Sequence, residues 1–376
     1  MNFVEATYLL SSRKKFKAEE RVKKYIECIF GGIGGKHFPS ISEVEEFYDS
    51  DYKLYKALVK IRFPVLMFQH DLYSILSIVY GEIVIPENVK LISVDFPAVF
   101  VDHFKGPRFG LRGIRERVNQ YHRPLLMAAL KPLNGITEEK FVGFLNQVIE
   151  GQVDIIREDE NFFDDSLFPF EKRVQVVSRI LKEKDKNILY LPFLSGSWTE
   201  MSEKIKLAQE YEINTFLINL FPLGLEGLQF LSDTFRCGFL VNPGYPSFFY
   251  EQDLFGIEPS ILYGRFIRMA GGDMVMIPSP YRHRTVPHYR SVEVANVLTE
   301  RFEDLEPSFP VVYGDMNPED LYTIFNDFGN QVIIDIGTSY KKFGDITGGV
   351  RKFSETLNCV ISGVPAEECI KNREQG

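Results

Sequence analysis

Asp159 and Glu160 are adjacent acids that follow the apolar run 153–156, with Arg157 between the run and the acids. A short apolar run bounded by turn residues predicts a buried parallel strand that carries the acids at its C-terminal end. Carboxylates are hard oxygen ligands suited to Mg²⁺, which takes one or two of them and keeps several water molecules. The alternative is a network of ion pairs with Arg157 and Lys131, which would neutralise both acids.

Lys131 follows a second apolar run, residues 125–130, and is a candidate for proton transfer. A lysine at the end of a buried strand has a partly desolvated stem, so it can shuttle a proton or polarise a substrate oxygen. The simpler interpretation is a lysine that only neutralises Asp159 or Glu160. We favour the chemical role, because a buried strand gains nothing else from a lysine.

Polar residues also follow other apolar runs, where they are candidates for holding a phosphorylated substrate. Gly337 and Thr338 can present backbone N–H groups to a phosphate, which is the usual position of a phosphate site in a barrel enzyme. The glycine-rich loop that ends in Lys36 is a second candidate for an anion, although glycine clusters more often mark a flexible turn. Further candidates at the ends of apolar runs are Asn219, Asn242 and Gly314.

The segment 282–290 is rich in basic side chains and predicts a mobile loop that closes over an anion. The alternative is an ordinary solvated loop. The basic residues of this segment are Arg282, His283, Arg284, His288 and Arg290.

From residue 124 onward, apolar runs alternate with helical patterns. Eight such units in roughly 250 residues are the count and length of a (β/α)8 barrel, in which the C-terminal ends of the strands converge on one pocket. An open doubly wound sheet is the alternative, but its glycine-rich first turn is missing. The predicted strands are 125–130, 153–156, 188–194, 215–220, 238–241, 274–277, 309–313 and 332–336.

The first part of the chain mixes short strands with helical patterns, which predicts a small α+β domain. The punctuated segment 105–110 indicates a linker, so we expect one domain over residues 1–105 and the barrel over residues 106–376. The predicted elements are strands 4–10, 52–63 and 89–96 and helices 18–29 and 69–79.

The composition is that of an ordinary globular protein of 376 residues, with 45% hydrophobic and 25% charged residues. A net charge of −9 argues against a nucleic-acid partner, because binding to phosphate backbones requires a basic surface. No apolar run approaches the length of a membrane span, and the first residues do not resemble a signal peptide. The four cysteines are scattered, which we interpret as reduced thiols in a cytoplasmic protein.

Several of these segments, in this order along the chain, resemble the RuBisCO large-subunit superfamily. They are residues 106–115, 123–126, 131–132 and 159–161. Within that superfamily, segments 162–163, 169–173 and 278–281 are most similar to the RuBisCO-like proteins of the methionine-salvage type, the 2,3-diketo-5-methylthiopentyl-1-phosphate enolases. The resemblance implies a ferredoxin-like N-terminal domain, a barrel, and a homodimer in which the partner's N-terminal domain completes the active site.

The resemblance also assigns roles by position. Lys131 matches a strand-end lysine of the family, and Asp159 and Glu160 match its two Mg²⁺-binding carboxylates. Arg157 stands where the family has a lysine that CO₂ converts to a carbamate, the third metal ligand. A guanidinium stays protonated, so we expect no carbamate at Arg157 and only weakened binding of Mg²⁺.

Other positions depart from the family. Leu133 replaces a second strand-end lysine of RuBisCO, Asn242 replaces a histidine, and the loop with His283 and Arg284 lacks RuBisCO's lysine. Glu82 stands where the enolases have a lysine that acts as base. A glutamate there can abstract a proton if desolvation raises its pKa.

Three functions follow from these residues, whereas carboxylation of ribulose bisphosphate is set aside because its carbamate, metal and loop lysine do not look intact. The favoured one is an enolase or isomerase that moves a proton next to a carbonyl group in a small phosphorylated keto compound. In it, Lys131 polarises oxygen, Glu82 of the partner chain is the base, and Arg157 supplies the charge of the metal. The second is the Mg²⁺-dependent enolase reaction of methionine salvage. The third is a dimer that binds a metabolite or a partner without turnover.

Overall fold

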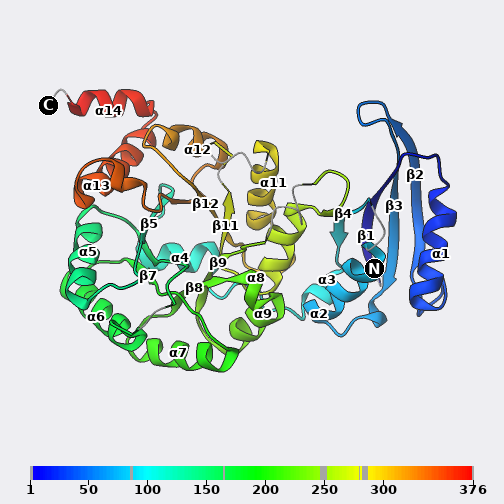
Figure 1. Ribbon diagram of the computed structural model, residues 1–376, viewed down its shortest axis with the longest axis horizontal. Helices are drawn as coiled ribbons and strands as arrows, with labels where there is room; N and C mark the ends of the chain where they lie inside the picture. The colour runs from blue at the N-terminus through cyan, green and yellow to red at the C-terminus, as the bar shows by residue number, and fades with distance from the viewer. Residues whose placement is uncertain are drawn as a thin grey trace.

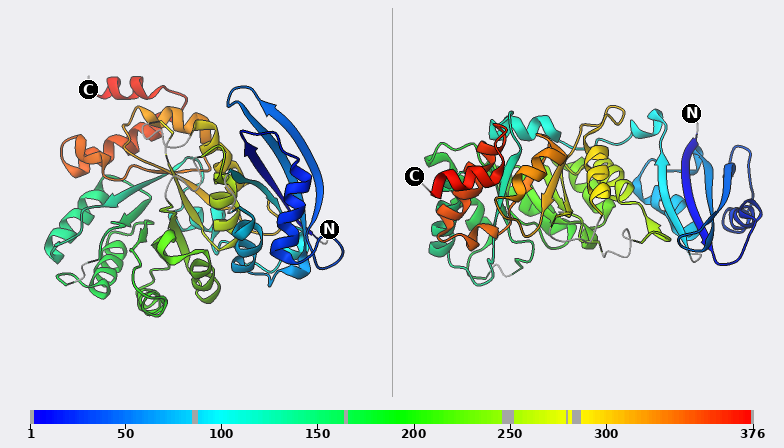
Figure 2. Two further views of the ribbon diagram at one scale, coloured as in Figure 1. Left: turned by 45° about the vertical axis from the view of Figure 1, so that its right-hand side comes forward. Right: turned by 90° about the horizontal axis from the view of Figure 1, so that it is seen from above.

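The computed structural model describes residues 3–84, 88–163, 166–245, 252–278, 280–281 and 287–374. It contains a mostly antiparallel five-stranded sheet, formed mainly by the N-terminal residues, and an eight-stranded parallel sheet. The first sheet stands at one end of the molecule, beside the second (Figure 1, Figure 2). The predicted fold class, an α+β unit followed by a barrel, is confirmed. The division at residues 105 and 106 stays a prediction.

The N-terminal sheet has the strand order β10-β4-β1-β3-β2. Its central strand alternates buried and partly exposed residues, as a strand with one face on a core does. Helix α1 (Ala18–Phe30) covers that face with Val22 and Ile26, one turn apart. The strands are β1 (Phe3–Ser12), β2 (Ser40–Asp49), β3 (Leu54–Pro64), β4 (Val89–Asp95) and β10 (Gly256–Ile257).

Two strands of this sheet have no counterpart in the sequence prediction. Strand β2 is an edge strand with mostly exposed, acidic residues, so it has no apolar alternation to reveal it. Strand β10 comes from the barrel part of the chain and pairs in parallel with β4. The predicted helix over residues 69–79 is shorter, with α2 (Leu72–Ile75) continuing as a π-helical turn over Leu76–Gly81.

The second sheet is a closed barrel with the strand order β7-β6-β5-β13-β12-β11-β9-β8. A parallel bridge between Phe193 and Leu217 joins its two ends. All eight predicted strands are present, with ends that shift by a few residues. They are β5 (Leu125–Leu130), β6 (Ile155–Glu158), β7 (Leu189–Leu191), β8 (Thr215–Asn219), β9 (Gly238–Asn242), β11 (Met274–Pro278), β12 (Phe309–Tyr313) and β13 (Ile333–Asp335).

Helices surround the barrel, as Figure 1 shows. Helix α5, for example, buries Phe141, Leu145 and Val148 at helical spacing. In chain order the helices after α2 are α3 (Ala98–Val101), α4 (Gly110–Val118), α5 (Glu138–Glu150), α6 (Phe170–Glu183), α7 (Trp198–Glu210), α8 (Leu220–Leu223), α9 (Leu225–Thr234), α10 (Ile267–Met269), α11 (His288–Thr299), α12 (Asp320–Phe328), α13 (Ile346–Val360) and α14 (Ala366–Glu374). In the described part of the chain, no helix has the length and apolar character that a membrane span requires.

The prediction of four reduced cysteines is wrong for one pair. Cys359 in α13 and Cys369 in α14 form a disulfide, whereas Cys28 and Cys237 are free. The two helices pack against each other, and their Cα atoms at these positions lie 6.0 Å apart. Sequence spacing alone cannot show this approach.

Side chains along each barrel strand alternate between the interior and the helices. Leu125 and Met127 of β5, Ile155 of β6 and Ile333 of β13 belong to one interior cluster. Two residues further along these strands, the same alternation brings Ala129, Arg157 and Asp335 to the C-terminal mouth of the barrel. The apolar interior therefore ends in a layer that contains two charged side chains.

Candidate active site

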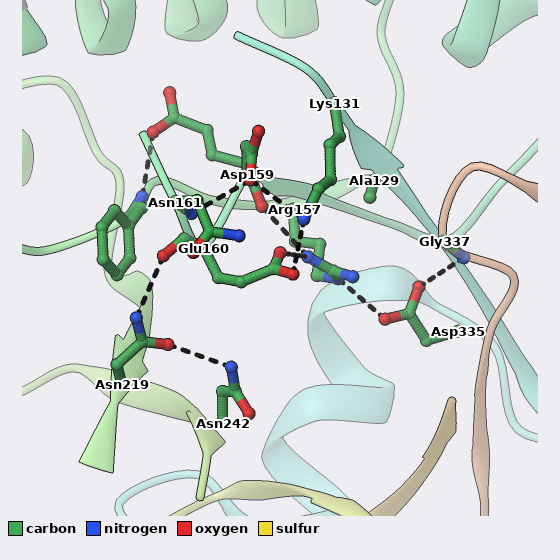
Figure 3. Close-up of polar contacts among 12 residues, drawn as sticks. Ala129, Lys131, Arg157, Asp159, Glu160, Asn161, Asn219, Asn242, Asp335 and Gly337 are labelled. Atoms are coloured by element: carbon green, nitrogen blue, oxygen red, sulfur yellow. Dashed lines mark hydrogen bonds and ion pairs between the residues drawn. The ribbon is translucent and has the colours of Figure 1, made fainter. Parts of the chain in front are cut away.

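Arg157 extends from β6 into this mouth and is only 5% exposed. Its Nε donates a hydrogen bond of 2.7 Å to Oδ2 of Asp335. Its Nη1 donates hydrogen bonds of 2.7 Å to Oε2 of Glu160 and of 3.2 Å to the carbonyl oxygen of Glu158. Figure 3 shows the guanidinium held between the two carboxylates. The buried charge is therefore paired on two sides.

Asp335 is fully buried at the end of β13. While Oδ2 accepts from Arg157, Oδ1 accepts a 2.8 Å hydrogen bond from the backbone N–H of Gly337. Strand β5 lies between β6 and β13, and its Ala129 stands in register with Arg157. The small side chain of Ala129 leaves room for the two longer side chains to meet across β5 (Figure 3).

Lys131 follows β5 and is bound by both predicted acids. Its Nζ lies 2.7 Å from Oε1 of Glu160 and 3.2 Å from Oδ1 of Asp159. Its side chain remains 33% exposed, whereas that of Asp159 is 3% exposed. The ion-pair network that the sequence offered as an alternative is thus present, and Glu160 is its centre.

The pairing sets the charge state of the cluster. Burial alone would lower the pKa of Lys131, but the carboxylates of Glu160 and Asp159 outweigh it and raise that pKa above its ordinary value. Burial would raise the pKa of Glu160, but Arg157 and Lys131 outweigh it and lower the pKa to about 2. Burial would lower the pKa of Arg157, but the carboxylates of Asp335 and Glu160 outweigh burial and raise that pKa above its ordinary value. All three groups are therefore charged at neutral pH.

Two asparagines connect the cluster to the next strands of the mouth. Asn219 at the end of β8 donates a 3.0 Å hydrogen bond to the carbonyl oxygen of Glu160. Asn242 at the end of β9 donates one of 3.0 Å to the side-chain oxygen of Asn219. This chain of amides fixes the backbone of Glu160 relative to β8 and β9 (Figure 3).

A second buried pair holds β6 from outside the barrel wall. Arg173 of α6 donates a 2.8 Å hydrogen bond from Nε to Oε1 of the fully buried Glu158, which also accepts from the hydroxyl of Tyr190. The other carboxylate oxygen accepts a 2.9 Å hydrogen bond from the backbone N–H of Phe193. Glu158 and Arg157 thus anchor the end of β6 on opposite faces.

A cavity of about 350 Å³ opens between the ends of β5, β6, β12 and β13. It brings together six predicted residues, which are Lys131, Arg157, Glu160, Gly314, Gly337 and Thr338. The other lining residues are Ala129, Tyr313, Asp315, Asp335, Ser339 and Lys342. The backbone N–H of Gly337, predicted as a phosphate donor, is already bonded to Asp335.

The donor set does not fit a Mg²⁺ ion. Both carboxylate oxygens of Glu160 accept hydrogen bonds from cationic side chains, and Oδ1 of Asp159 accepts from the backbone N–H of Asn161 and contacts Lys131. Mg²⁺ requires free oxygen ligands in octahedral geometry.

Other predicted residues lie elsewhere or outside the described part of the chain. Glu82 and Lys36 are exposed residues that precede β4 in the chain, away from the described lining of the cavity. His283 and Arg284, with Arg282, lie outside the described residues. The prediction of a mobile anion-binding loop is wrong for Arg290, which is buried at the start of α11.

Arg290 and His288 are held by acids. Nη2 of Arg290 donates a 2.8 Å hydrogen bond to Asp253, and its Nε lies 3.1 Å from Glu258. Nε2 of His288 lies 2.8 Å from Asp327. Both side chains therefore already have carboxylate partners.

Sequence reasoning missed Asp335 and Lys342 as site residues and assigned no role to Asp315, which follows the predicted strand 309–313. Asp335 had a signal, because it is the one charged residue in the apolar strand 332–336. Lys342 forms an ion pair with Asp315 across the ends of β13 and β12. Lys342 had no signal, since it lies several residues beyond the end of its strand.

The barrel agrees with the comparisons with known proteins. Residues 110–375 match the ribulose bisphosphate carboxylase large chain, catalytic domain, and the chain belongs to this family. A similar sequence is the 2,3-diketo-5-methylthiopentyl-1-phosphate enolase of Geobacillus thermodenitrificans. It is 31% identical over an alignment 403 residues long, gaps included, which covers 100% of this chain and 96% of the enolase. The enolase of Geobacillus kaustophilus is 30% identical with the same coverage.

Solved structures give the same fold. A rubisco-like protein from Alicyclobacillus acidocaldarius superimposes with a TM-score of 0.90 at 25% identity, covering 100% of this chain and 98% of that one. The ribulose-1,5-bisphosphate carboxylase/oxygenase of Pyrococcus horikoshii superimposes with a TM-score of 0.88 at 21% identity, covering 99% and 92%. The second likeness concerns the fold alone.

Proposed function

We propose that this RuBisCO-like protein is an enzyme of the enolase or isomerase type, which moves a proton next to a carbonyl group in a small phosphorylated keto compound. The observation that carries the proposal is the Lys131 ammonium group. It is partly exposed on the cavity, fixed by two carboxylates, and lies among cationic groups suited to stabilise a developing enolate oxygen.

The charge states of Lys131 and Glu160 indicate which groups can donate and which can accept a proton. Lys131 is protonated at neutral pH because Glu160 and Asp159 raise its pKa, so it acts as a hydrogen-bond donor to the carbonyl oxygen rather than as the base. Glu160, with a pKa of about 2, is too weak a base to abstract a carbon-bound proton. A different group takes that proton, and we assign this role to Glu82 of a second copy in a homodimer.

The other side of the cavity suits the phosphate group. Gly314, Gly337 and Thr338 line it beside Ser339 and Lys342, so hydroxyl and ammonium groups lie close to the backbone N–H groups of Gly314 and Thr338, whereas the N–H of Gly337 is bonded to Asp335. We assign further substrate contacts to Lys36, Asn242, His283 and Arg284. Reaction in the cytoplasm is part of the proposal.

The relatives suggest a first substrate to test. Two proteins at least 30% identical to this chain are named 2,3-diketo-5-methylthiopentyl-1-phosphate enolase, and they match the whole chain. The phosphate and the adjacent carbonyl groups of that compound have the chemistry that the cavity suits. We therefore place the protein in methionine salvage as the more specific form of the proposal.

Deuterium incorporation tests proton abstraction directly. The protein is incubated in D₂O with 2,3-diketo-5-methylthiopentyl-1-phosphate or another diketo or ketose phosphate, and exchange at the carbon next to the carbonyl is followed by NMR. Wild-type protein exchanges that proton. Lys131→Ala abolishes exchange, and Lys140→Ala, which removes an exposed lysine of α5, does not. Exchange that survives Lys131→Ala would contradict the role of Lys131. Absence of exchange with every compound tested would contradict the proposal that the protein is an enzyme.

One observation favours a non-catalytic metabolite-binding dimer as the second candidate. Lys131, Arg157, Asp159, Glu160 and Asp335 form a cluster in which each charged side chain is paired with another. Such a cluster can be structural, because a buried charge is stable only when paired. This function predicts that a sugar phosphate raises the melting temperature while no compound undergoes exchange.

A further inference from the structure

The guanidinium of Arg157 is the buried cation of the barrel mouth. By resemblance, this position would carry a carbamate that binds a divalent cation. We infer that the Arg157–Asp335 pair takes the place of that cation, with Asp335 as the positioning residue, so that proton transfer needs no divalent metal. This inference rests on the proposed function and adds to it the group whose positive charge stabilises the developing oxyanion.

The guanidinium is fixed at two of its three nitrogens. Asp335 holds Nε and Glu160 holds Nη1, both at 2.7 Å. Because the guanidinium is planar, two anchors, Asp335 at the end of β13 and Glu160 just after β6, fix the orientation of the whole group. A lysine ammonium at the end of a flexible chain would not be fixed in this way.

The third nitrogen remains available. Among the described residues, Nη2 donates no hydrogen bond. It is also absent from the buried side-chain atoms that lack a partner, so it is not sealed off from solvent. Arg157 also lines the cavity. Nη2 therefore keeps two N–H donors for an oxygen of a bound compound, beside the Lys131 ammonium. Two fixed cationic donors on one developing oxyanion are an electrostatic substitute for a Lewis acid.

Asp335 allows the charged side chain of Arg157 to remain buried. Without it, Glu160 would be the one carboxylate partner left to Arg157 among the described residues, and Glu160 is shared with Lys131. An unpaired buried cation is costly, so the side chain would turn towards water. The partner of Asp335 on its other oxygen is a backbone N–H, which fixes the carboxylate itself.

The test compares Asp335→Asn with wild-type protein, both dialysed against EDTA, in the deuterium-exchange assay. We expect wild-type exchange to change less than about twofold on chelation. Asp335→Asn keeps the size of the side chain but loses its charge, and we expect kcat to fall by about 10²-fold, the usual effect of misplacing one oxyanion donor. We expect KM to change little and Asp335→Glu to restore part of kcat. A purely structural role would instead lower the melting temperature and the active fraction without changing kcat per folded molecule.

Each outcome separates the inference from the function on which it rests. Exchange that requires added Mg²⁺ overturns the inference and leaves the proposed function intact. Exchange that Asp335→Asn does not slow removes the positioning role.

Absence of exchange in wild-type protein overturns the proposed function, and calorimetric titration of wild-type protein with MgCl₂ then decides the remaining claim. Stoichiometric binding contradicts replacement of the cation, and no heat of binding supports it. This titration also serves if Asp335→Asn fails to fold.

Discussion

Arg157 and Asp335 meet across an intervening strand of the barrel. They extend from β6 and β13, β5 runs between them, and Nε of Arg157 lies 2.7 Å from Oδ2 of Asp335. The pair closes the apolar interior with a buried cation and anion instead of further aliphatic side chains. Its position at the mouth of the barrel makes it part of the site rather than of the core.

Ala129 makes this meeting possible, since it faces Arg157 from the intervening strand. We expect Ala129→Leu to separate the pair and to cost about 1–3 kcal/mol of unfolding free energy through overpacking. We also expect it to slow deuterium exchange. Met127→Leu, one interior layer below, is the matched control and should cost less than about 1.5 kcal/mol. Urea denaturation with exchange kinetics checks both, and equal effects of the two substitutions would contradict the role of Ala129.

The identity of residue 157 decides whether a cation can bind. We expect Arg157→Lys alone to bind no Mg²⁺ in the presence of bicarbonate, because Asp335 favours the protonated amine and would repel a carbamate. Arg157→Lys combined with Asp335→Ala removes that obstacle and should bind Mg²⁺. Calorimetric titration with and without bicarbonate distinguishes the two variants. Equal affinity in both would mean that Asp335 does not control the charge at this position.

Glu160 links the cluster to acid stability. Its pKa of about 2 in the folded protein lies below its ordinary value of 4.5, so its contribution is present above pH 4.5 and is lost as the pH falls towards 2. Wild-type protein should therefore exceed Glu160→Gln in unfolding free energy at pH 7, and the difference should shrink below pH 4.5. Chemical denaturation at several pH values measures it, and a difference that does not change with pH would rule out this linkage.

The pair between Glu158 and Arg173 supports β6 from the helix side. Their side chains are 0% and 2% exposed and lie 2.8 Å apart. Removing one partner of a buried pair leaves an uncompensated charge, so we expect Arg173→Ala to lower the unfolding free energy by about 3–5 kcal/mol. The exposed pair Lys17–Glu20 provides the control, since Lys17→Ala should leave the denaturation midpoint unchanged. A stable Arg173→Ala protein would show that β6 is held by other contacts.

The disulfide predicts the thiol count. Denatured, unreduced protein should react with a thiol reagent at two cysteines, Cys28 and Cys237. Reduction should expose Cys359 and Cys369 and lower the unfolding free energy by about 2–4 kcal/mol, as for other short disulfide loops. Cys28→Ser is the control that lowers the thiol count without changing stability. Four reactive thiols before reduction would contradict the pairing.

The sequence predicted the barrel well because each of its strands is a short apolar run with polar residues at its C-terminal end. Lys131, Arg157 and Glu160 could be grouped for the same reason, since parallel strands end at one mouth. Strand β2 could not be predicted, because an exposed edge strand has no apolar alternation. Asp335 could be recognised as a charged residue in an apolar strand, but its pairing with Arg157 could not be predicted, since only the closure of the barrel brings the two together. The disulfide depends in the same way on the packing of two helices.

The central claim is that the ion pair between the Arg157 guanidinium and the Asp335 carboxylate takes the place of a divalent cation. Titration of wild-type protein with Mn²⁺ in the presence of bicarbonate tests this claim most directly. Electron paramagnetic resonance distinguishes the free aqueous ion from the bound one. The account predicts that the signal of free Mn²⁺ grows in proportion to the added metal from the first addition. One Mn²⁺ bound per chain, displaced by Mg²⁺ and lost in Asp159→Asn, would contradict it.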